Sequence, residues 1–119
     1  MAAARSAKKI LNSLLNLQGV NAVTVVGRDG FVIESETSGE TDLDALGAIV
    51  STGYGASEVM ASEMELGSLS QTMIECESGK ILMADCGDAV LAVITEEDAI
   101  IGNIRHNIAK VVDELAEAI

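Results

Sequence analysis

The stretch AVTVVGRDGFVIESE, residues 22–36, decides how the first third of the chain folds. Residues 22–27 are rich in Val and Thr, which favour extended backbone, and residues 31–36 resume the same character. Between them, Asp29-Gly30 favours the tight primed turn of a two-residue hairpin. The stretch therefore predicts an antiparallel hairpin.

Amphipathic helices are expected on both sides of this hairpin and at the end of the chain. Apolar residues recur there at intervals of three and four, the period of one helix face. The segments are residues 3–18, 43–64 and 101–119. Gly47, Gly53 and Gly55 interrupt the middle segment, and each costs a helix up to about 1 kcal/mol relative to Ala. They predict that another backbone comes unusually close to this helix.

Three further strands follow the middle helix. They are expected at residues 68–77, 80–85 and 89–94, with a turn at Ser78-Gly79. The last is an uninterrupted apolar run, which fits a central strand covered on both faces. Thr41, with Asp44 three residues later, resembles a capping box for the middle helix, and Thr95 is expected to cap the last helix.

The order of elements is helix, two strands, long helix, three strands and helix. No proline or disordered linker divides it, so residues 1–119 are expected to form one domain. A layered arrangement around a five-stranded antiparallel sheet would bury the apolar stripe of every element. The middle helix then covers one face and the two terminal helices cover the other, which is an α+β sandwich within the broad α/β class.

Charge and composition limit the possible partners. Seven Lys and Arg stand against nineteen Asp and Glu, a net charge of −12 that disfavours nucleic acid. Between residues 29 and 98 the only basic residue is Lys80, so the middle of the fold should attract basic patches on another protein. Solubility, or adaptation to a salty cytoplasm, is an alternative reason for this acidity. No apolar run is long enough for membrane insertion, and two cysteines that are not expected to pair indicate a reducing, cytoplasmic location.

Residue patterns for catalysis or cofactor binding are weak. His106 is the only histidine, so no zinc site is expected. Gly53-Tyr54-Gly55 begins like a dinucleotide fingerprint, but Glu58 occupies the third glycine position. Nothing near Cys86 would activate its thiol. If Ser78-Gly79 is the turn, Cys76 pairs with Ile81, and the two cysteines lie roughly 16 Å apart, too far for a disulfide. We expect no catalytic residue, cofactor or metal.

Five motifs nevertheless resemble a known family in their order and spacing. They are Gly27-Arg28-Asp29-Gly30-Phe31-Val32-Ile33, Gly79-Lys80-Ile81-Leu82, Asp85-Cys86-Gly87-Asp88, Leu91-Ala92-Val93-Ile94 and Gly102-Asn103-Ile104-Arg105. Together they cover essentially the whole chain, which resembles the Roadblock domain family. The resemblance implies a Roadblock-like fold with profilin-like layering. It also implies a homodimer or heterodimer in which third strands pair edge to edge and second helices lie together.

By this likeness, the dimer surface has a helix part and a strand part. The residues implied are Gly47, Val50, Tyr54, Ser57 and Met64 on the helix, and Leu69, Gln71, Met73 and Glu75 on the strand. The implied function is a dimeric, non-enzymatic module that binds and regulates a Ras-like small GTPase. The alternative is a structural adaptor or scaffold subunit, as in dynein light chains. Arg28 and Arg105 are interpreted as surface charges and not as arginine fingers.

Overall fold

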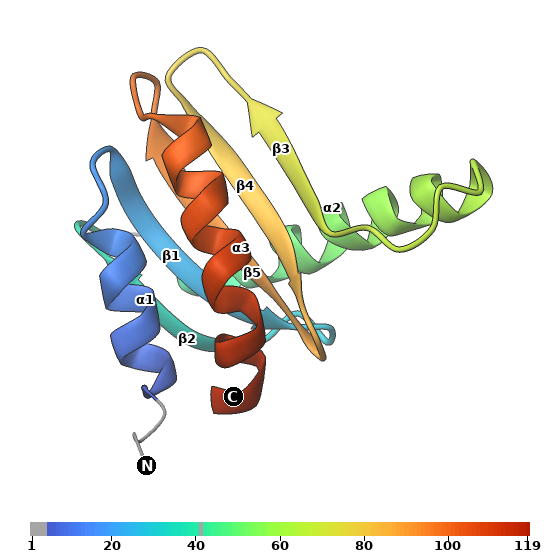
Figure 1. Ribbon diagram of the computed structural model, residues 1–119, viewed down its shortest axis with the longest axis horizontal. Coiled ribbons are helices and arrows are strands. Elements are labelled where there is room, and N and C mark those ends of the chain that lie inside the picture. The colour runs from blue at the N-terminus through green and yellow to red at the C-terminus, as the bar shows by residue number, and fades with distance from the viewer. Residues whose placement is uncertain (1–4, 41) are drawn as a thin grey trace.

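A five-stranded antiparallel sheet lies between two layers of helices in the computed structural model, which describes residues 5–40 and 42–119 (Figure 1). The elements are α1 (Ala7–Leu15), β1 (Val20–Gly27), β2 (Val32–Thr37), α2 (Leu43–Glu63), β3 (Gln71–Glu75), β4 (Gly79–Cys86), β5 (Ala89–Glu96) and α3 (Ile101–Ala118). The strand order in the sheet is β2-β1-β5-β4-β3. The predicted fold class and sheet are therefore confirmed. None of the helices among the described residues is long and apolar enough to cross a bilayer.

The helices divide between the two faces of the sheet as predicted. α1 and α3 pack together on one face, and α2 crosses the other face over β1, β2 and β5 (Figure 1). Each interface has its own apolar cluster, and the smaller one, under α2, contains Val50, Tyr54 and Met83. β5 is the central strand. Its first five residues are all buried, as the continuous apolar run predicted.

The turn of the first hairpin packs closely against α2. Gly30 has a positive φ of 91°, and its carbonyl oxygen faces Gly47 of α2. A Cβ atom built on Gly47 would lie 2.6 Å from that oxygen, which is closer than real contacts allow. The close approach predicted from the glycines is therefore confirmed at Gly47. In contrast, a Cβ atom built on Gly55 would have no atom within 4 Å.

Gly47→Ala is expected to lower the free energy of unfolding by about 1–3 kcal/mol, because the methyl group must push the hairpin turn and α2 apart. Gly102→Ala in α3 is the matched control, since nothing lies within 4 Å of that position. Urea unfolding of both variants measures the difference. Equal stability of Gly47→Ala and Gly102→Ala would contradict the close packing described above.

The predicted position of the turn between β3 and β4 is wrong. The turn between β3 and β4 lies at Glu77-Ser78, because Glu75 pairs with Lys80 and Cys76 N donates to Gly79 O at 2.9 Å. Each β3 residue therefore pairs two positions earlier on β4 than expected. The cysteines are nonetheless unpaired, as predicted, with Cys76 exposed and Cys86 buried.

The expected helix caps also differ from the observed ones. Thr95 does not cap α3, because it stays in β5, where it pairs with both Val20 and Lys80. α3 begins later, with Ile100 at its N-cap and no side-chain cap. Thr41 lies outside the described residues. At the start of α2 the Asp42 side chain accepts a hydrogen bond from Ala45 N at 3.2 Å.

Candidate dimer and partner-binding surface

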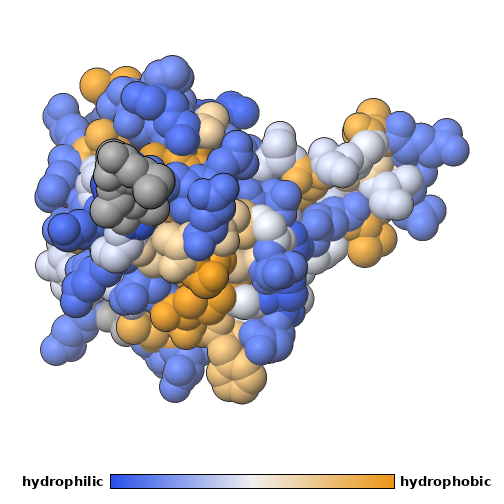
Figure 2. Space-filling model, turned by 60° about the horizontal axis from the view of Figure 1, so that its bottom comes forward, coloured by the Kyte–Doolittle hydropathy of each residue, from blue (hydrophilic) through white to orange (hydrophobic). Residues whose placement is uncertain are grey.

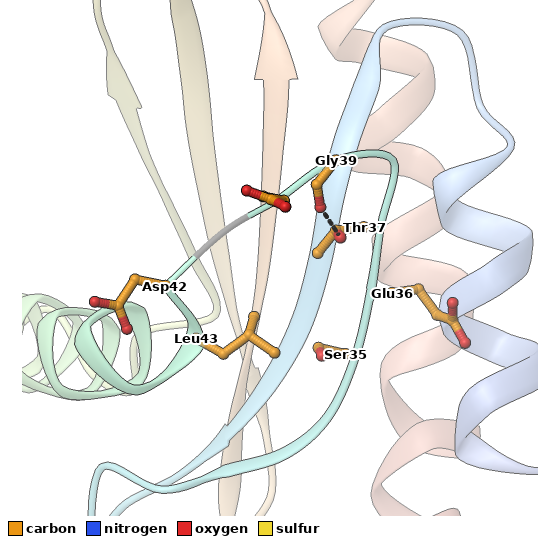
Figure 3. Close-up of a pocket in the computed structure, with 7 residues that line it drawn as sticks. Ser35, Glu36, Thr37, Gly39, Asp42 and Leu43 are labelled. Carbon is orange, nitrogen blue, oxygen red and sulfur yellow. Dashed lines mark hydrogen bonds between the residues drawn. The ribbon is translucent and has the colours of Figure 1, made fainter.

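One open hollow lies between β2 and the start of α2 and has a volume of about 710 Å³ (Figure 3). Its lining residues are Ser35, Glu36, Thr37, Gly39, Glu40, Asp42 and Leu43. Figure 3 shows Glu36 pointing toward the helices on the other face, where Lys8 Nζ lies 3.9 Å from its carboxylate. Asp42 caps α2 instead, and Thr37 Oγ1 donates to Gly39 O. These carboxylates serve local structure and do not converge on a common point.

The other side chains that could bind a metal ion or act in catalysis are separated from one another or buried. His106 is exposed on α3, and the described residues contain no group of three His, Cys, Asp or Glu side chains able to hold a metal ion. Burial, together with Asp85 and Asp113, raises the pKa of Cys86 to about 11. Its thiol donates to Val112 O at 3.6 Å. Cys86 is therefore a protonated packing residue at neutral pH.

The most unusual surface feature is the second half of α2, which runs past the β3 edge of the sheet (Figure 1). We call residues 55–67 the arm. Tyr54 is the last buried residue of α2, and the apolar side chains beyond it are exposed: Val59, Met60, Met64 and Leu66 are 60–77% exposed. Figure 2 shows the arm as a lobe standing clear of the body at the right, with hydrophobic side chains among hydrophilic ones. A projection with this much exposed apolar surface is typical of a protein interaction site.

β3, beside the arm, forms one edge of the sheet. Only β4 pairs with it, so every second backbone group of β3 points outward without a strand partner among the described residues. Met73 is 38% exposed on one face and Ile74 is 43% exposed on the other. The Oε1 atom of Gln71 is buried and has no hydrogen-bond partner within the part of the chain that the structure describes, which is rare for a buried oxygen.

The nine residues implied for the dimer surface separate into two groups. Gly47, Val50 and Tyr54 are buried within this chain, and the side chains of Val50 and Tyr54 belong to the apolar cluster under α2. Their assignment to the dimer surface stays a prediction. Met64, Met73 and Glu75 are exposed, while Ser57, Leu69 and Gln71 are half-buried beside them on the arm side or the β3 edge.

The surroundings of Tyr54 raise the pKa of its hydroxyl group. Burial raises its pKa to about 12, Asp85 and Glu58 act in the same direction, and Arg28 opposes them. Its hydroxyl donates to Leu69 O at 2.8 Å, which ties α2 to the segment that leads into β3. Tyr54 is therefore the residue at which the core ends and the arm begins.

Comparisons with known proteins identify the family and the fold of this chain. Residues 6–95 match the family model of the Roadblock/LC7 domain. An uncharacterized protein of Methanocaldococcus jannaschii is 39% identical over 107 residues, covering 90% of this chain and 94% of that protein. A Roadblock/LC7 domain from Streptomyces avermitilis is similar with a TM-score of 0.86 and 16% identity, covering 95% of this chain and 97% of that one. The gliding protein MglB of Thermus thermophilus has a TM-score of 0.85 and 20% identity, covering 94% of this chain and 87% of that one. Because the family model spans most of its length, this chain belongs to the Roadblock/LC7 domain family.

Proposed function

We propose that this Roadblock-type regulatory or adaptor module works as a homodimer joined through β3 and the arm. The single observation that carries the proposal is the open β3 edge next to an exposed apolar arm. Antiparallel pairing of two β3 strands would satisfy their outward-facing backbone groups. It would also join two sheets into one and bring hydrogen-bond donors of a second copy close to Gln71 Oε1.

The arm has a complementary surface on a second copy. Ile74 of β3 pairs with Ile81, which packs against the cluster under α2, so Ile74 lies on the same face of the sheet as α2. Ile74 stays 43% exposed there, because α2 covers β1, β2 and β5. When two β3 edges meet, each arm passes over this open face of the other copy. The same patch then serves both copies, as a twofold interface requires.

For the partner we infer a Ras-like small GTPase, which the family resemblance implies. The net charge of −12 supports a partner with a basic patch, because opposite charges speed association and orient the encounter. The module would contribute positioning to the GTPase. Arg28 supports this view, since both ends of its guanidinium are held by carboxylates of its own chain and are not free to enter another active site.

A binding measurement distinguishes a regulator from an adaptor. Ras-like GTPases from the same genome, loaded with GDP or a GTP analogue, are tested by surface plasmon resonance at several ionic strengths. We expect preference for the GTP form and an association rate that falls with salt. Arg105→Ala should leave any stimulated hydrolysis within a few fold, whereas loss of an arginine finger costs roughly a thousandfold or more.

Equal affinity for both nucleotide states would favour the adaptor instead. A loss of stimulated GTP hydrolysis of roughly a thousandfold or more in Arg105→Ala would contradict the positioning mechanism. Absence of binding to every Ras-like GTPase tested would remove this partner class altogether.

A further inference from the structure

One side chain links the arm to three parts of the body. Arg28, in the turn between β1 and β2, places Nη1 at 2.5 Å from Glu58 Oε1 on the arm and Nη2 at 2.8 Å from Asp85 Oδ1 on β4. The same Nη2 lies 3.4 Å from Gly87 O. Its guanidinium carbon lies 5.4 Å from the centre of the Tyr54 ring, within the range of a cation–π interaction.

Among the described residues, no other side chain holds the arm in this way. Within residues 5–40 and 42–119, Arg28 to Glu58 is the only side-chain hydrogen bond or ion pair that joins residues 55–67 to an element other than α2 itself. Beneath the arm lies a hollow of about 690 Å³. Glu58, Ser62 and Glu65 line it from the arm, while Arg28 and Asp85 line it from the body. The arm therefore stands over open space and is fixed near its base.

The geometry of a guanidinium explains why Arg suits this position. Its planar fork presents several N–H donors at fixed angles and binds two carboxylates at once, which the single ammonium group of Lys cannot do with the same geometry. Asp85 anchors one side of the fork to the sheet, and Glu58 attaches the arm to the other side. The Tyr54 ring supports the plane from the core.

We infer that Arg28 is a positioning residue that sets the direction of the arm and thereby the affinity of the dimer. The inference rests on the proposed homodimer. Partly exposed ion pairs contribute little singly, and Arg28, Glu58 and Asp85 side chains are 38–46% exposed. The three residues affect the direction of the arm together, because Glu58 and Asp85 both bind the guanidinium of Arg28. If the fork is lost, the arm keeps its helical backbone but tilts over a wider range, and only part of that range can bind a second copy.

Arg28→Ala tests this inference against Arg105→Ala, which also removes one positive charge but lies exposed on α3. We expect the dimer dissociation constant to rise roughly tenfold in Arg28→Ala and less than about twofold in Arg105→Ala. Arg28→Lys should resemble Arg28→Ala, because it keeps the charge without the fork. Adding Glu58→Gln to Arg28→Ala should cause little further loss, because the two residues act as a pair. Circular dichroism verifies that each variant is folded.

A second measurement separates failure of this inference from failure of the homodimer. Amide hydrogen exchange of residues 55–67 is followed at concentrations where the chain is monomeric. We expect several-fold faster exchange in Arg28→Ala than in Arg105→Ala. If the wild-type chain never dimerises, the homodimer is wrong, but this comparison still decides whether Arg28 holds the arm. Equal exchange of the arm in both variants, or equal dimer affinity, would overturn the inference.

Discussion

Met73→Lys is expected to convert the protein from a dimer to a monomer at micromolar concentration. Met73 is 38% exposed in the middle of the β3 edge, where the second β3 strand would pair. A lysine at this position brings two positive charges together across the twofold axis and must lose water to be buried there. The dissociation constant should rise by about a hundredfold or more. Analytical ultracentrifugation measures it.

Ile33→Lys provides the control for this change. Ile33 is 49% exposed on β2, at the opposite edge of the sheet, and receives the same substitution. It should leave the dimer intact. Helical content, measured by circular dichroism, should be unchanged in both variants. If Met73→Lys and Ile33→Lys dimerise equally well, β3 does not form the interface.

Tyr54→Ala is expected to lower the free energy of unfolding by about 3–5 kcal/mol, the usual cost of removing a buried aromatic ring. The ring is 0% exposed and packs in the cluster under α2, while its hydroxyl donates to Leu69 O. Tyr54→Phe keeps the ring and loses only the hydrogen bond, so it should cost about 1 kcal/mol. Urea unfolding at fixed protein concentration measures both variants.

This expectation differs from the one that the family resemblance implied. If Tyr54 lay on the dimer surface, Tyr54→Ala would separate the two copies and leave the monomer stable. A variant with nearly unchanged unfolding and a weakened dimer would therefore contradict the burial described above. A large loss of stability would agree with the place of Tyr54 in the core.

Most of the fold could be predicted because its signals are local. The extended-strand character on each side of Asp29-Gly30 indicates a hairpin, and the apolar run of β5 indicates a central strand. The register of β3 against β4 was harder to predict from the sequence, because Glu77-Ser78 and Ser78-Gly79 are both plausible turns. Moving the turn by one residue shifts the pairing by two, so each side chain keeps its face.

The candidate site was only partly predictable, because helical periodicity does not show where a helix leaves its sheet. Tyr54 and Met60 belong to one apolar stripe in the sequence, yet Tyr54 is 0% exposed and Met60 is 63% exposed. The difference depends on the width of the sheet beneath α2, which is a tertiary property. The exposed Val59 and Leu66 were missed for the same reason.

The role of Arg28 had no signal in the sequence. Its two carboxylate partners lie 30 and 57 residues away, on different elements. A charged residue in a hairpin turn is normally a surface charge, and the sequence supports no other interpretation. Only the packing of the hairpin turn against α2, with Gly47 at the contact, brings Arg28, Glu58 and Asp85 together.

The central claim is that two copies of this chain form the functional unit. Sedimentation equilibrium of the wild-type protein at micromolar concentration tests it most directly. We predict a single species with about twice the 12.3 kDa mass of the chain. A folded species of 12.3 kDa that persists as the concentration is raised tenfold would contradict the claim.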